Sequence, residues 1–472
     1  MYITTTIPYV NARPHLGHAL ELVQADVLAR HHRRLGEPVR FQTGTDDNSL
    51  KNVLAAEAEG VPVRELVDRN AAAFEGLRGT LDLSFDSFIR TSAHHGHRAG
   101  VAEIWRATAH DLYQRHYEGL YCVGCEQFYP QGPCPDGHEQ PLQRVSEENW
   151  FFRLSRYQDA LLDLIGSGRL RIEPVARRNE VLAFVEAGLA DISVSRSAAR
   201  VKGWGIPVPG DPGQVVYVWW DALANYVTAL DGGGAYERWW VREPRKVHLM
   251  GKGVIRFHAV YWPAMLLSAG RPLPTDIFVH DYLTAGGRKL SKSSGDPADP
   301  VALVAAYGVD AVRWWLLREV PRVGDADFTE ARLAARADED LANGLGNLVN
   351  RVATMVCRFL DGHVPPAGEV LAETSVGGRV SEALDDFDFR RAALAVWTIV
   401  ADANRYVERT HPWQQSRAGQ EASLGTLVHA CRALAVELEP FLPGAAARVA
   451  AAVSGERLSS PKPLFPRQAR RA

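Results

Sequence analysis

The sequence predicts an α/β protein that has a parallel sheet with a small insertion and ends in an all-helical region. Three observations support this fold class. In the first part of the chain, β-rich runs alternate with segments of helical periodicity, as in parallel sheets with crossover helices. Three of the five cysteines lie in one short loop-like stretch in the middle of this pattern. From about residue 327 onward, apolar residues recur at helical spacing.

Length and composition are compatible with this organisation. A chain of 472 residues is too long for one core and indicates about three structural units. Hydrophobic residues make up 46% and charged residues 23%, as in ordinary globular proteins. The net charge of -3 gives no nucleic-acid signal, which requires a local basic face. The odd cysteine count, the strand at the very start and the lack of a long apolar run predict a cytoplasmic protein without signal peptide or membrane span.

The first strand and helix offer a candidate phosphate site. A β-rich run over residues 2–7 is followed by a loop, and then by His15, Gly17 and His18 at the start of a helix predicted over 20–35. Helix N-termini after a strand present backbone N–H groups and a positive dipole end to phosphate. The two imidazoles can bind phosphate oxygens, and Gly17 allows close approach. Two core or surface histidines, or half of a metal site, are the alternatives.

The second strand, predicted over 39–43, leads to Asp46. Carboxylates at the carboxyl end of a parallel strand hold polar ligands, which makes Asp46 a candidate binding residue. For Asp47 and Ser49 a helix N-cap role is the better interpretation. Helices are predicted over 51–60 and 63–81. No GxGxxG or Walker A pattern occurs here, which disfavours dehydrogenases and P-loop enzymes.

The insertion carries a candidate metal site. Its spacing is Cys-x2-Cys-x8-Cys-x3-His, formed by Cys122, Cys125, Cys134 and His138. This is typical of a closed structural zinc site, and a short loop without its own core needs such a cross-link. Three reduced cysteines in a loop are the alternative.

The sheet then resumes and ends in a basic loop. A β-branched run over 214–218 leads into Trp219, whose aromatic neighbours would ordinarily be core residues. A strand over 277–279 precedes a Gly-Gly turn and the run Lys289-Leu-Ser-Lys-Ser293. Lysines on a mobile loop can follow a triphosphate toward its transition state.

The last region predicts a helical bundle. One long helix is expected over 330–360, a second from Asp388 to the segment Thr410-His-Pro-Trp413, and two more over 424–442 and 445–453. Cys357 and Cys431 lie on apolar helix faces and are expected in the core.

His15-Leu-Gly-His18 and Lys289–Ser293 together resemble the paired signatures of class I aminoacyl-tRNA synthetases. The residues around both, and the stretches 147–158 and 192–196, resemble methionyl-tRNA synthetases in particular, from Ile3 to about Leu442. The resemblance implies a Rossmann-like catalytic domain with a zinc-knuckle insertion and a helical anticodon-binding domain. The expected domains are 1–110 (first half of the catalytic domain), 111–205 (insertion), 206–325 (second half) and 326–472 (anticodon-binding domain).

The resemblance also implies an activity. ATP with Mg²⁺ and methionine would give methionyl-adenylate, and the methionyl group would pass to tRNA(Met). The catalytic residues would be His15, His18, Lys289 and Lys292, joined in ATP binding by Gly17, Ser291 and Ser293. Asp46 would hold the substrate α-ammonium, and the methionine pocket would be lined by Ile7, Tyr9, Trp219, Ala222, Tyr226 and His258. Zn²⁺ would be bound by Cys122, Cys125, Cys134 and His138, and the CAU anticodon would be read by Asn347, Arg351 and Trp413. A soft thioether is well matched by aromatic walls, and a Trp that stacks on a base is typical of single-stranded RNA recognition.

The sequence departs from the family pattern at three strand ends. Asp47-Asn48-Ser49 stands where Glu/Ala-His-Gly is usual, Gly253 replaces the aspartate of Gly-Lys-Asp, and Asp281 replaces the glycine of His-Gly-Tyr/Trp. An appended C-terminal dimerisation domain is absent, so a monomer is expected. Two alternatives stay open: a paralogue that makes an aminoacyl-adenylate or aminoacyl-tRNA for specialised metabolism, and a catalytically silent tRNA-binding protein.

Overall fold

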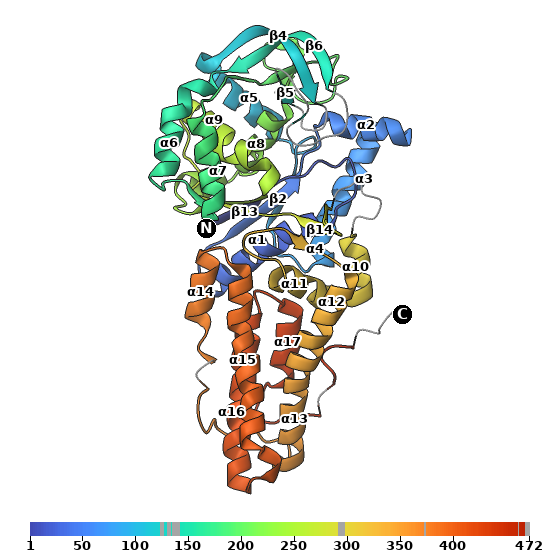
Figure 1. The fold of residues 1–472 in the computed structure, drawn as a ribbon, viewed down its shortest axis with the longest axis vertical. Helices are drawn as coiled ribbons and strands as arrows, with labels where there is room; N and C mark the ends of the chain where they lie inside the picture. The colour runs from blue at the N-terminus through green and yellow to red at the C-terminus, as the bar shows by residue number, and fades with distance from the viewer. Residues whose placement is uncertain are drawn as a thin grey trace. The chain divides into compact units, whose positions relative to one another are not determined.

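The computed structural model describes the chain apart from residues 123–126, 130–133, 135–141, 291–297, 372–373, 461 and 468–472, and gives the backbone alone at 127–129 and 288–289. The chain forms two compact units, each built from several segments (Figure 1). The first unit comprises Met1–Pro14, Pro38–Gly76 and Phe85–His280. The second comprises His15–Glu37, Leu77–Ser84 and Asp281–Ala472.

A six-stranded sheet forms the centre of the first unit, and every neighbouring pair in it is parallel. Its order is β3-β2-β1-β12-β13-β7. The strands are β1 (Tyr2–Thr5), β2 (Arg40–Thr45), β3 (Ser87–Arg90), β7 (Arg171–Glu173), β12 (Lys246–Gly251) and β13 (Asp276–His280). From β1 the chain builds outward through β2 and β3, and it later builds the other side through β12 and β13. The direction therefore reverses between β1 and β12, where ligands bind in open parallel sheets. The predicted Rossmann-like fold class is confirmed.

Helices and a continuous apolar core support this sheet. Tyr2, Ile277, Trp220 and Trp262 are almost fully buried in the same core cluster. The helices of this unit are α2 (Leu50–Glu59), α3 (Val63–Glu75), α5 (His97–Ala107), α6 (Gln158–Gly166), α7 (Val175–Glu186), α8 (Val218–Thr228) and α9 (Trp262–Ser268), with a π-helical turn η5 (Phe257–Tyr261) before α9. Helix α5 packs against α8, which fixes the helix that follows the insertion.

The insertion is a separate antiparallel sheet of order β5-β4-β6-β8. Figure 1 shows its long pair β4 (Leu112–Cys122) and β6 (Gln143–Phe152), which are in register from Leu112 opposite Phe152 to Tyr121 opposite Gln143. The short strands β5 (Gln127–Tyr129) and β8 (Ile192–Ser193) flank it. Three further strands, β9 (Ser195–Ser197), β10 (Pro207–Val208) and β11 (Asp211–Val216), lead the chain back toward α8.

The second unit is mainly helical. Its elements are α1 (Leu16–Arg34), α4 (Leu77–Thr80), α10 (Pro300–Tyr307), α11 (Val309–Arg318), α12 (Glu330–Arg336), α13 (Asn347–Leu360), α14 (Gly377–Asp385), α15 (Phe389–Thr410), α16 (Arg417–Leu438) and α17 (Pro443–Ala452), with a small sheet of β14 (Leu283–Ala285), β15 (Arg288–Lys289) and β16 (Ala326–Asp327). Figure 1 shows α13, α15 and α16 side by side as a bundle. In the described part of the chain no single helix is long and apolar enough to cross a membrane; one pair, α10 and α11, passes that test together but is bent by 114°.

The bundle largely follows the predicted elements. The helix predicted from Asp388 is α15, and the Asp388 side chain caps it by accepting from the Arg391 N–H at 2.9 Å. The long helix predicted over 330–360 is helical throughout, but residues Ala337–Gly346 form a π-helical stretch between α12 and α13. Helix α16 begins at Arg417, seven residues before the predicted start at residue 424, because Ser416 caps a first turn that lacks apolar periodicity.

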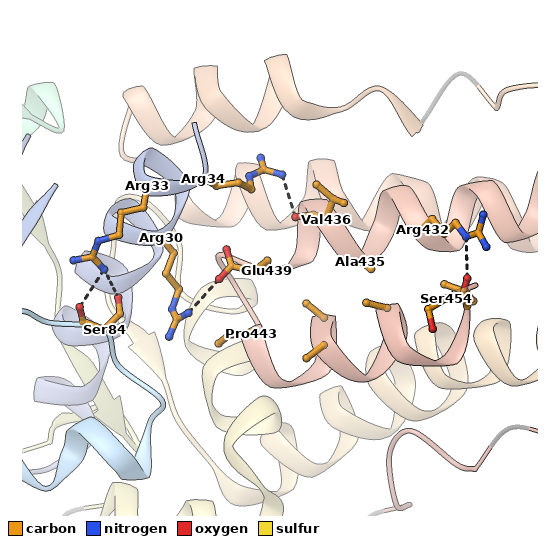
Figure 2. A pocket seen from close by; sticks show the side chains of 14 residues that line it. Arg30, Arg33, Arg34, Ser84, Arg432, Ala435, Val436, Glu439, Pro443 and Ser454 are labelled. Atoms are coloured by element: carbon orange, nitrogen blue, oxygen red, sulfur yellow. Dashed lines mark hydrogen bonds and ion pairs between the residues drawn. The ribbon is translucent and has the colours of Figure 1, made fainter. Parts of the chain in front are cut away.

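A cavity of about 940 Å³ lies within the second unit among α1, α16 and α17 (Figure 2). Arg30 on α1 donates to Glu439 at 3.1 Å, and Arg34 donates to the Val436 carbonyl at 3.0 Å. Arg33, Arg432, Ala435, Ala446, Ala450 and Ser454 also line it. Through these hydrogen bonds the arginines hold α1 against the end of α16. The cavity therefore lies at a packing contact between helices of the second unit.

Candidate active site

The carboxyl ends of β1 and β2 are joined directly. Tyr9, in the loop after β1, forms an isolated parallel bridge with Asp46, and the Asp46 N–H donates to the Pro8 carbonyl at 2.9 Å. Asp46 is 1% exposed, and its Oδ1 accepts from the Asn48 backbone N–H at 3.1 Å. A buried carboxylate thus lies at the carboxyl end of β2, next to the loop that follows β1, and its ligand-binding role stays a prediction.

Several predicted pocket residues are brought together beside this edge. Trp219 and Tyr226 lie on α8 seven residues apart, hence on one helix face, and Ala222 lies between them. The Tyr9 ring is 6.2 Å from that of Trp219, and the Tyr226 hydroxyl is 2.8 Å from His258 Nε2. Ile7 is half-buried in the same loop as Tyr9.

The hydrogen bonds at His258 define its protonation. Its Nδ1 is 2.9 Å from the Val254 carbonyl, which can only accept, so Nδ1 carries the proton. In the neutral ring Nε2 then accepts from the Tyr226 O–H. His258 is 2% exposed, and its ring is bonded to Tyr226, another of the predicted pocket residues.

Two residues of this region were missed from the sequence. Phe257 stacks on Trp219 with ring centroids 3.8 Å apart and planes 5° apart. His248, on β12, lies 4.2 Å from the Tyr226 ring, and its Nδ1 is 2.5 Å from Thr4 Oγ1. Complete burial holds the pKa of His248 well below its ordinary value, so the ring is neutral. The aromatic run around His258 was a signal for Phe257, whereas nothing in the β12 sequence distinguished His248 from a strand residue.

The neighbours of Asp46 have structural roles. Ser49 is the N-cap of α2 and accepts from the Lys51 N–H at 3.1 Å, as predicted. Asp47 does not cap a helix: its carboxylate accepts from Arg90 at 3.2 Å and from Ser92 at 2.7 Å. Burial raises the pKa of Asp47, and these partners counteract that effect in part.

In the second unit, His15 and His18 form a reciprocal cap at the start of α1. His15 Nδ1 accepts from the Gly17 N–H at 3.1 Å, and His18 Nδ1 accepts from the His15 N–H at 3.0 Å. Because both Nδ1 atoms are acceptors, each neutral ring carries its proton on Nε2 and is a donor there. A Cβ on Gly17 would lie 2.9 Å from the His15 ring, so a larger residue there would displace the ring from its place in this cap. The backbone N–H groups expected to face a phosphate are bonded within the chain, because Leu16 N–H donates to the Ala298 carbonyl and His18 N–H to the His15 carbonyl, each at 2.9 Å. The phosphate-binding role of the two rings stays a prediction.

The basic loop lies largely outside the described residues. The Gly286–Gly287 turn has φ values of +58° and +75°, as the hairpin between β14 and β15 requires. The backbone of Lys289, on β15, pairs with Thr284 on β14, while Ser291, Lys292 and Ser293 are not described. Their predicted roles stay predictions.

The structure describes the surroundings of Asp281 and Gly253, two of the residues that depart from the family pattern. Asp281 is 3% exposed and its Oδ2 accepts from the Gly324 N–H at 2.7 Å, which ties the start of the second unit to a turn of the same unit. Gly253 lies in the short 3₁₀ turn Lys252–Val254 after β12.

The candidate zinc ligands are described only in part. Cys122 and Cys134 are buried, 1% and 7% exposed, and neither forms a disulfide. Cys125 and His138 lie outside the described residues. Among the residues that are described, no group of three or more His, Cys, Asp or Glu side chains could hold a metal ion. The zinc site therefore stays a prediction, although the burial of Cys122 and Cys134 fits such a site.

The predicted anticodon residues lie in the helical bundle. Asn347 is exposed at the start of α13, and Arg351 follows one turn later. Trp413 lies in the 3₁₀ turn Pro412–Gln414 and is 42% exposed, with its ring 5.2 Å from that of His411. This exposure is incompatible with a core role for Trp413 and leaves its ring accessible to a base.

The parallel sheet, the helix that begins at His15 and the helical bundle define a class I aminoacyl-tRNA synthetase. A family model described as "tRNA synthetases class I (M)" matches residues 1–144 and 137–353, and one described as "Anticodon binding domain of methionyl tRNA ligase" matches residues 371–467. The chain belongs to the methionyl-tRNA synthetase family.

Individual relatives agree with this assignment over nearly the whole chain. The methionine–tRNA ligase of Brucella suis is 39% identical over 508 residues, which cover 99% of this chain and 97% of the relative. That of Mycobacterium bovis is 41% identical, covering 95% and 91%. The structure of Mycobacterium tuberculosis methionyl-tRNA synthetase in complex with methionyl-adenylate has a TM-score of 0.92 at 38% identity and covers 99% of both chains.

Proposed function

We propose that this protein is a methionine–tRNA ligase that converts methionine and ATP into methionyl-adenylate and pyrophosphate and then transfers the methionyl group to tRNA(Met). The observation that carries the proposal is the aromatic cluster of Trp219, Tyr226 and His258, which Tyr9 connects to the buried Asp46. The Asp46 carboxylate suits an α-ammonium, and the aromatic rings suit an apolar, polarisable side chain.

In the first step, Asp46 holds the α-ammonium of methionine and leaves the substrate carboxylate free to react. A carboxylate oxygen forms a bond to the α-phosphorus of ATP, and the bond from that phosphorus to the bridging oxygen breaks. Pyrophosphate leaves with the electron pair. Charge builds on the phosphoryl oxygens, where preorganised donors have their largest effect.

Four residues of the two signature motifs are the proposed donors. His15 and His18 donate from Nε2 to phosphate oxygens at the N-terminus of α1. Lys289 and Lys292 follow the triphosphate as it moves, with Ser291 and Ser293 in the same loop. Mg²⁺ bound to the incoming ATP would neutralise part of the phosphate charge beside these side chains.

Transfer then requires recognition of the tRNA. Trp413 stacks on an anticodon base, while Asn347 and Arg351 contact base edges, which is how single-stranded RNA is usually read. Adenylate formation and anticodon recognition thus depend on different residues, so single substitutions separate them.

Zinc binding by Cys122, Cys125, Cys134 and His138 has a structural role in this proposal. A tetrahedral site would fix the loop between β4 and β6. Metal analysis of the purified protein should give about one zinc per chain. Cys125→Ser should lower the zinc content, and an unchanged zinc content in that variant would contradict the ligand assignment.

Amino-acid-dependent ATP–pyrophosphate exchange over a panel of amino acids tests the activity directly. We expect exchange with methionine and, in a second assay, charging of initiator and elongator tRNA(Met). No exchange with any amino acid would refute the proposal and favour a silent tRNA-binding protein. Exchange with methionine without charging would favour the paralogue that supplies an activated amino acid. The departures from the family pattern at Asn48, Gly253 and Asp281 are the reason to consider that alternative.

A further inference from the structure

Asn48 connects Asp46 to helix α8, the two parts of the chain expected to bind the amino acid. Its backbone N–H donates to Asp46 Oδ1 at 3.1 Å, and its side-chain Nδ2 donates to Asp221 Oδ2 at 2.7 Å. Asp221 lies on α8 between Trp219 and Ala222. One residue therefore links the carboxylate expected to hold the α-ammonium to the helix that carries the aromatic wall.

The anchor at Asp221 is itself fixed. Asp221 Oδ1 is 2.6 Å from His97 Nε2, and His97 Nδ1 is 2.6 Å from Thr228 Oγ1. A carboxylate can only accept, so His97 donates from Nε2, and in the neutral ring Nδ1 accepts from the Thr228 hydroxyl. Asp221 is 1% exposed and His97 is fully buried, so this chain of hydrogen bonds is shielded from water and has little freedom to move.

The loop is held in place independently of the Asn48 side chain. Asn52 Nδ2 donates to the Asp47 carbonyl at 2.9 Å and to the Asp46 carbonyl at 3.2 Å. Trp204 Nε1 also donates to the Asp47 carbonyl, at 2.8 Å. Loss of the Asn48 amide should therefore leave the loop folded and change mainly the direction of the Asp46 carboxylate relative to α8.

We infer that Asn48 is a positioning residue that sets the place of the Asp46 carboxylate relative to the side-chain pocket on α8, and so determines affinity and selectivity for methionine. The inference rests on the proposed function, in which Asp46 holds the α-ammonium. Asn48 acts through Asp46 and does not itself contact the reacting atoms. Because the α-ammonium is held in both the ground state and the transition state, loss of this link raises KM for methionine and leaves kcat nearly unchanged.

The test measures methionine-dependent ATP–pyrophosphate exchange by the full chain. Asn48→Ala removes a hydrogen bond to a charged group and should raise KM for methionine about tenfold or more, with KM for ATP unchanged. Asn48→Asp places a second carboxylate against Asp221 and should raise KM further. Both variants should also discriminate less between methionine and S-methylcysteine, whose side chain is one methylene shorter.

Two controls separate positioning from a general structural effect. Asn149→Ala removes a matched hydrogen bond, from Asn149 Nδ2 to Glu147 Oε1 at 3.0 Å in the insertion sheet, and should leave KM for methionine unchanged. In an Asp46→Asn background, Asn48→Ala should have no further effect on methionine affinity, measured by calorimetry if exchange is too slow.

Unchanged KM for methionine in both Asn48 variants would overturn the inference while the proposed function stands. A full further loss of affinity in the Asp46→Asn background, or an equal rise in KM for ATP, would also overturn it. Absence of methionine-dependent exchange by the unaltered chain would instead refute the proposed function and the inference with it.

Discussion

At the scale of single residues, the structure gives the histidine pair a defined protonation that spacing alone does not give. The sequence places His15 and His18 in one helical turn, and this pair together with Lys289–Ser293 predicts an ATP site. The bonds from backbone N–H groups to both Nδ1 atoms show that each neutral ring donates from Nε2. Each histidine thus caps the helix through Nδ1, and the proposed function gives its Nε2–H a second role as a phosphate donor.

Substitutions at His18 can separate these two functions. The Oδ1 of Asn occupies the place of Nδ1, so His18→Asn keeps the cap and loses the donor, whereas His18→Gln places an N–H near the position of Nε2. His18→Ala and His18→Asn should lower kcat for exchange by about 10²–10³-fold, the usual cost of one transition-state donor. His18→Gln should retain more activity than His18→Asn. Equal activities of the two amide variants would show that Nε2 does not act as the donor.

Residues carried by motifs were predictable, whereas residues fixed by tertiary contacts were not. Asp46 and Trp219 follow strand ends, and a strand end is visible in a sequence. Phe257, His248 and the link from Asn48 to Asp221 depend on which elements become neighbours. Pairing at such separations has no local sequence signal.

At the scale of secondary structure, the sequence predicted both ends of α15 correctly. Asp388 caps its first turn, and the helix ends where His411 adopts a left-handed backbone conformation. Apolar periodicity did not predict the π-helical stretch Ala337–Gly346, since one extra residue per turn shifts the apolar face without removing it. It placed the start of α16 too late because the first turns of that helix are exposed and polar.

The turn between α15 and α16 carries the clearest test of the bundle. Trp413→Ala should leave methionine-dependent exchange unchanged and lower kcat/KM for tRNA charging by about 5- to 150-fold, given about 1–3 kcal/mol for one base–aromatic stack. Val436→Ala, at an exposed apolar position on α16, is the matched control and should charge normally. Normal charging by Trp413→Ala would remove this residue from the anticodon site.

Helix α1 carries a pH-sensitive contact with α14. His31 is buried, its Nε2 lies 3.1 Å from Ser381 Oγ, and burial together with His32 and Arg34 lowers its pKa from 6.5 to about 4. The unfolded chain therefore binds a proton between these values and the folded chain does not. Stability is fully present above pH 6.5 and decreases as the pH falls toward 4, by up to about 3 kcal/mol.

Urea denaturation as a function of pH measures this contribution. His31→Gln keeps a hydrogen-bonding group near Ser381 and does not titrate, so the free energy of unfolding should fall less steeply between pH 6.5 and 4 in this variant. Parallel curves for the two proteins would show that another group is responsible.

At the scale of the whole molecule, the sequence predicted the class of architecture because strand–helix alternation and bundle periodicity extend over most of the chain. It did not indicate how the second unit gathers segments from both ends of the sequence. Helix α1, residues 77–84 and everything from Asp281 onward pack into one body. Arg313 shows why this was not predictable: within Arg313-Trp-Trp on α11 it looks like a surface arginine, yet it is 1% exposed.

Arg313 joins its own helix, α11, to three other segments of the second unit. Its guanidinium donates to Asp26 on α1 at 2.8 Å, to the Leu81 carbonyl at 2.9 Å, and to the Phe441 carbonyl before α17 at 2.9 Å. Burial raises the pKa of Asp26, but Arg313, Arg30 and the Ser84 hydrogen bonds outweigh it and hold that pKa below its usual value. The helix that begins with His15 and His18 is thereby anchored to the end of the bundle.

Arg313→Met should lower the free energy of unfolding by about 3–5 kcal/mol, because it leaves the Asp26 carboxylate buried with one partner fewer. The double variant Asp26→Leu/Arg313→Met removes both charges and should be more stable than Arg313→Met alone. Arg448→Met is the matched control, since Arg448 pairs with Asp310 at an exposed position and its loss should cost about 1 kcal/mol or less. If Arg313→Met and Arg448→Met were equally stable, the buried pair would contribute no more than a surface one. If instead Arg313→Met loses stability while its folded fraction keeps full exchange activity, the pair serves folding of the second unit alone and not the placement of His15 and His18.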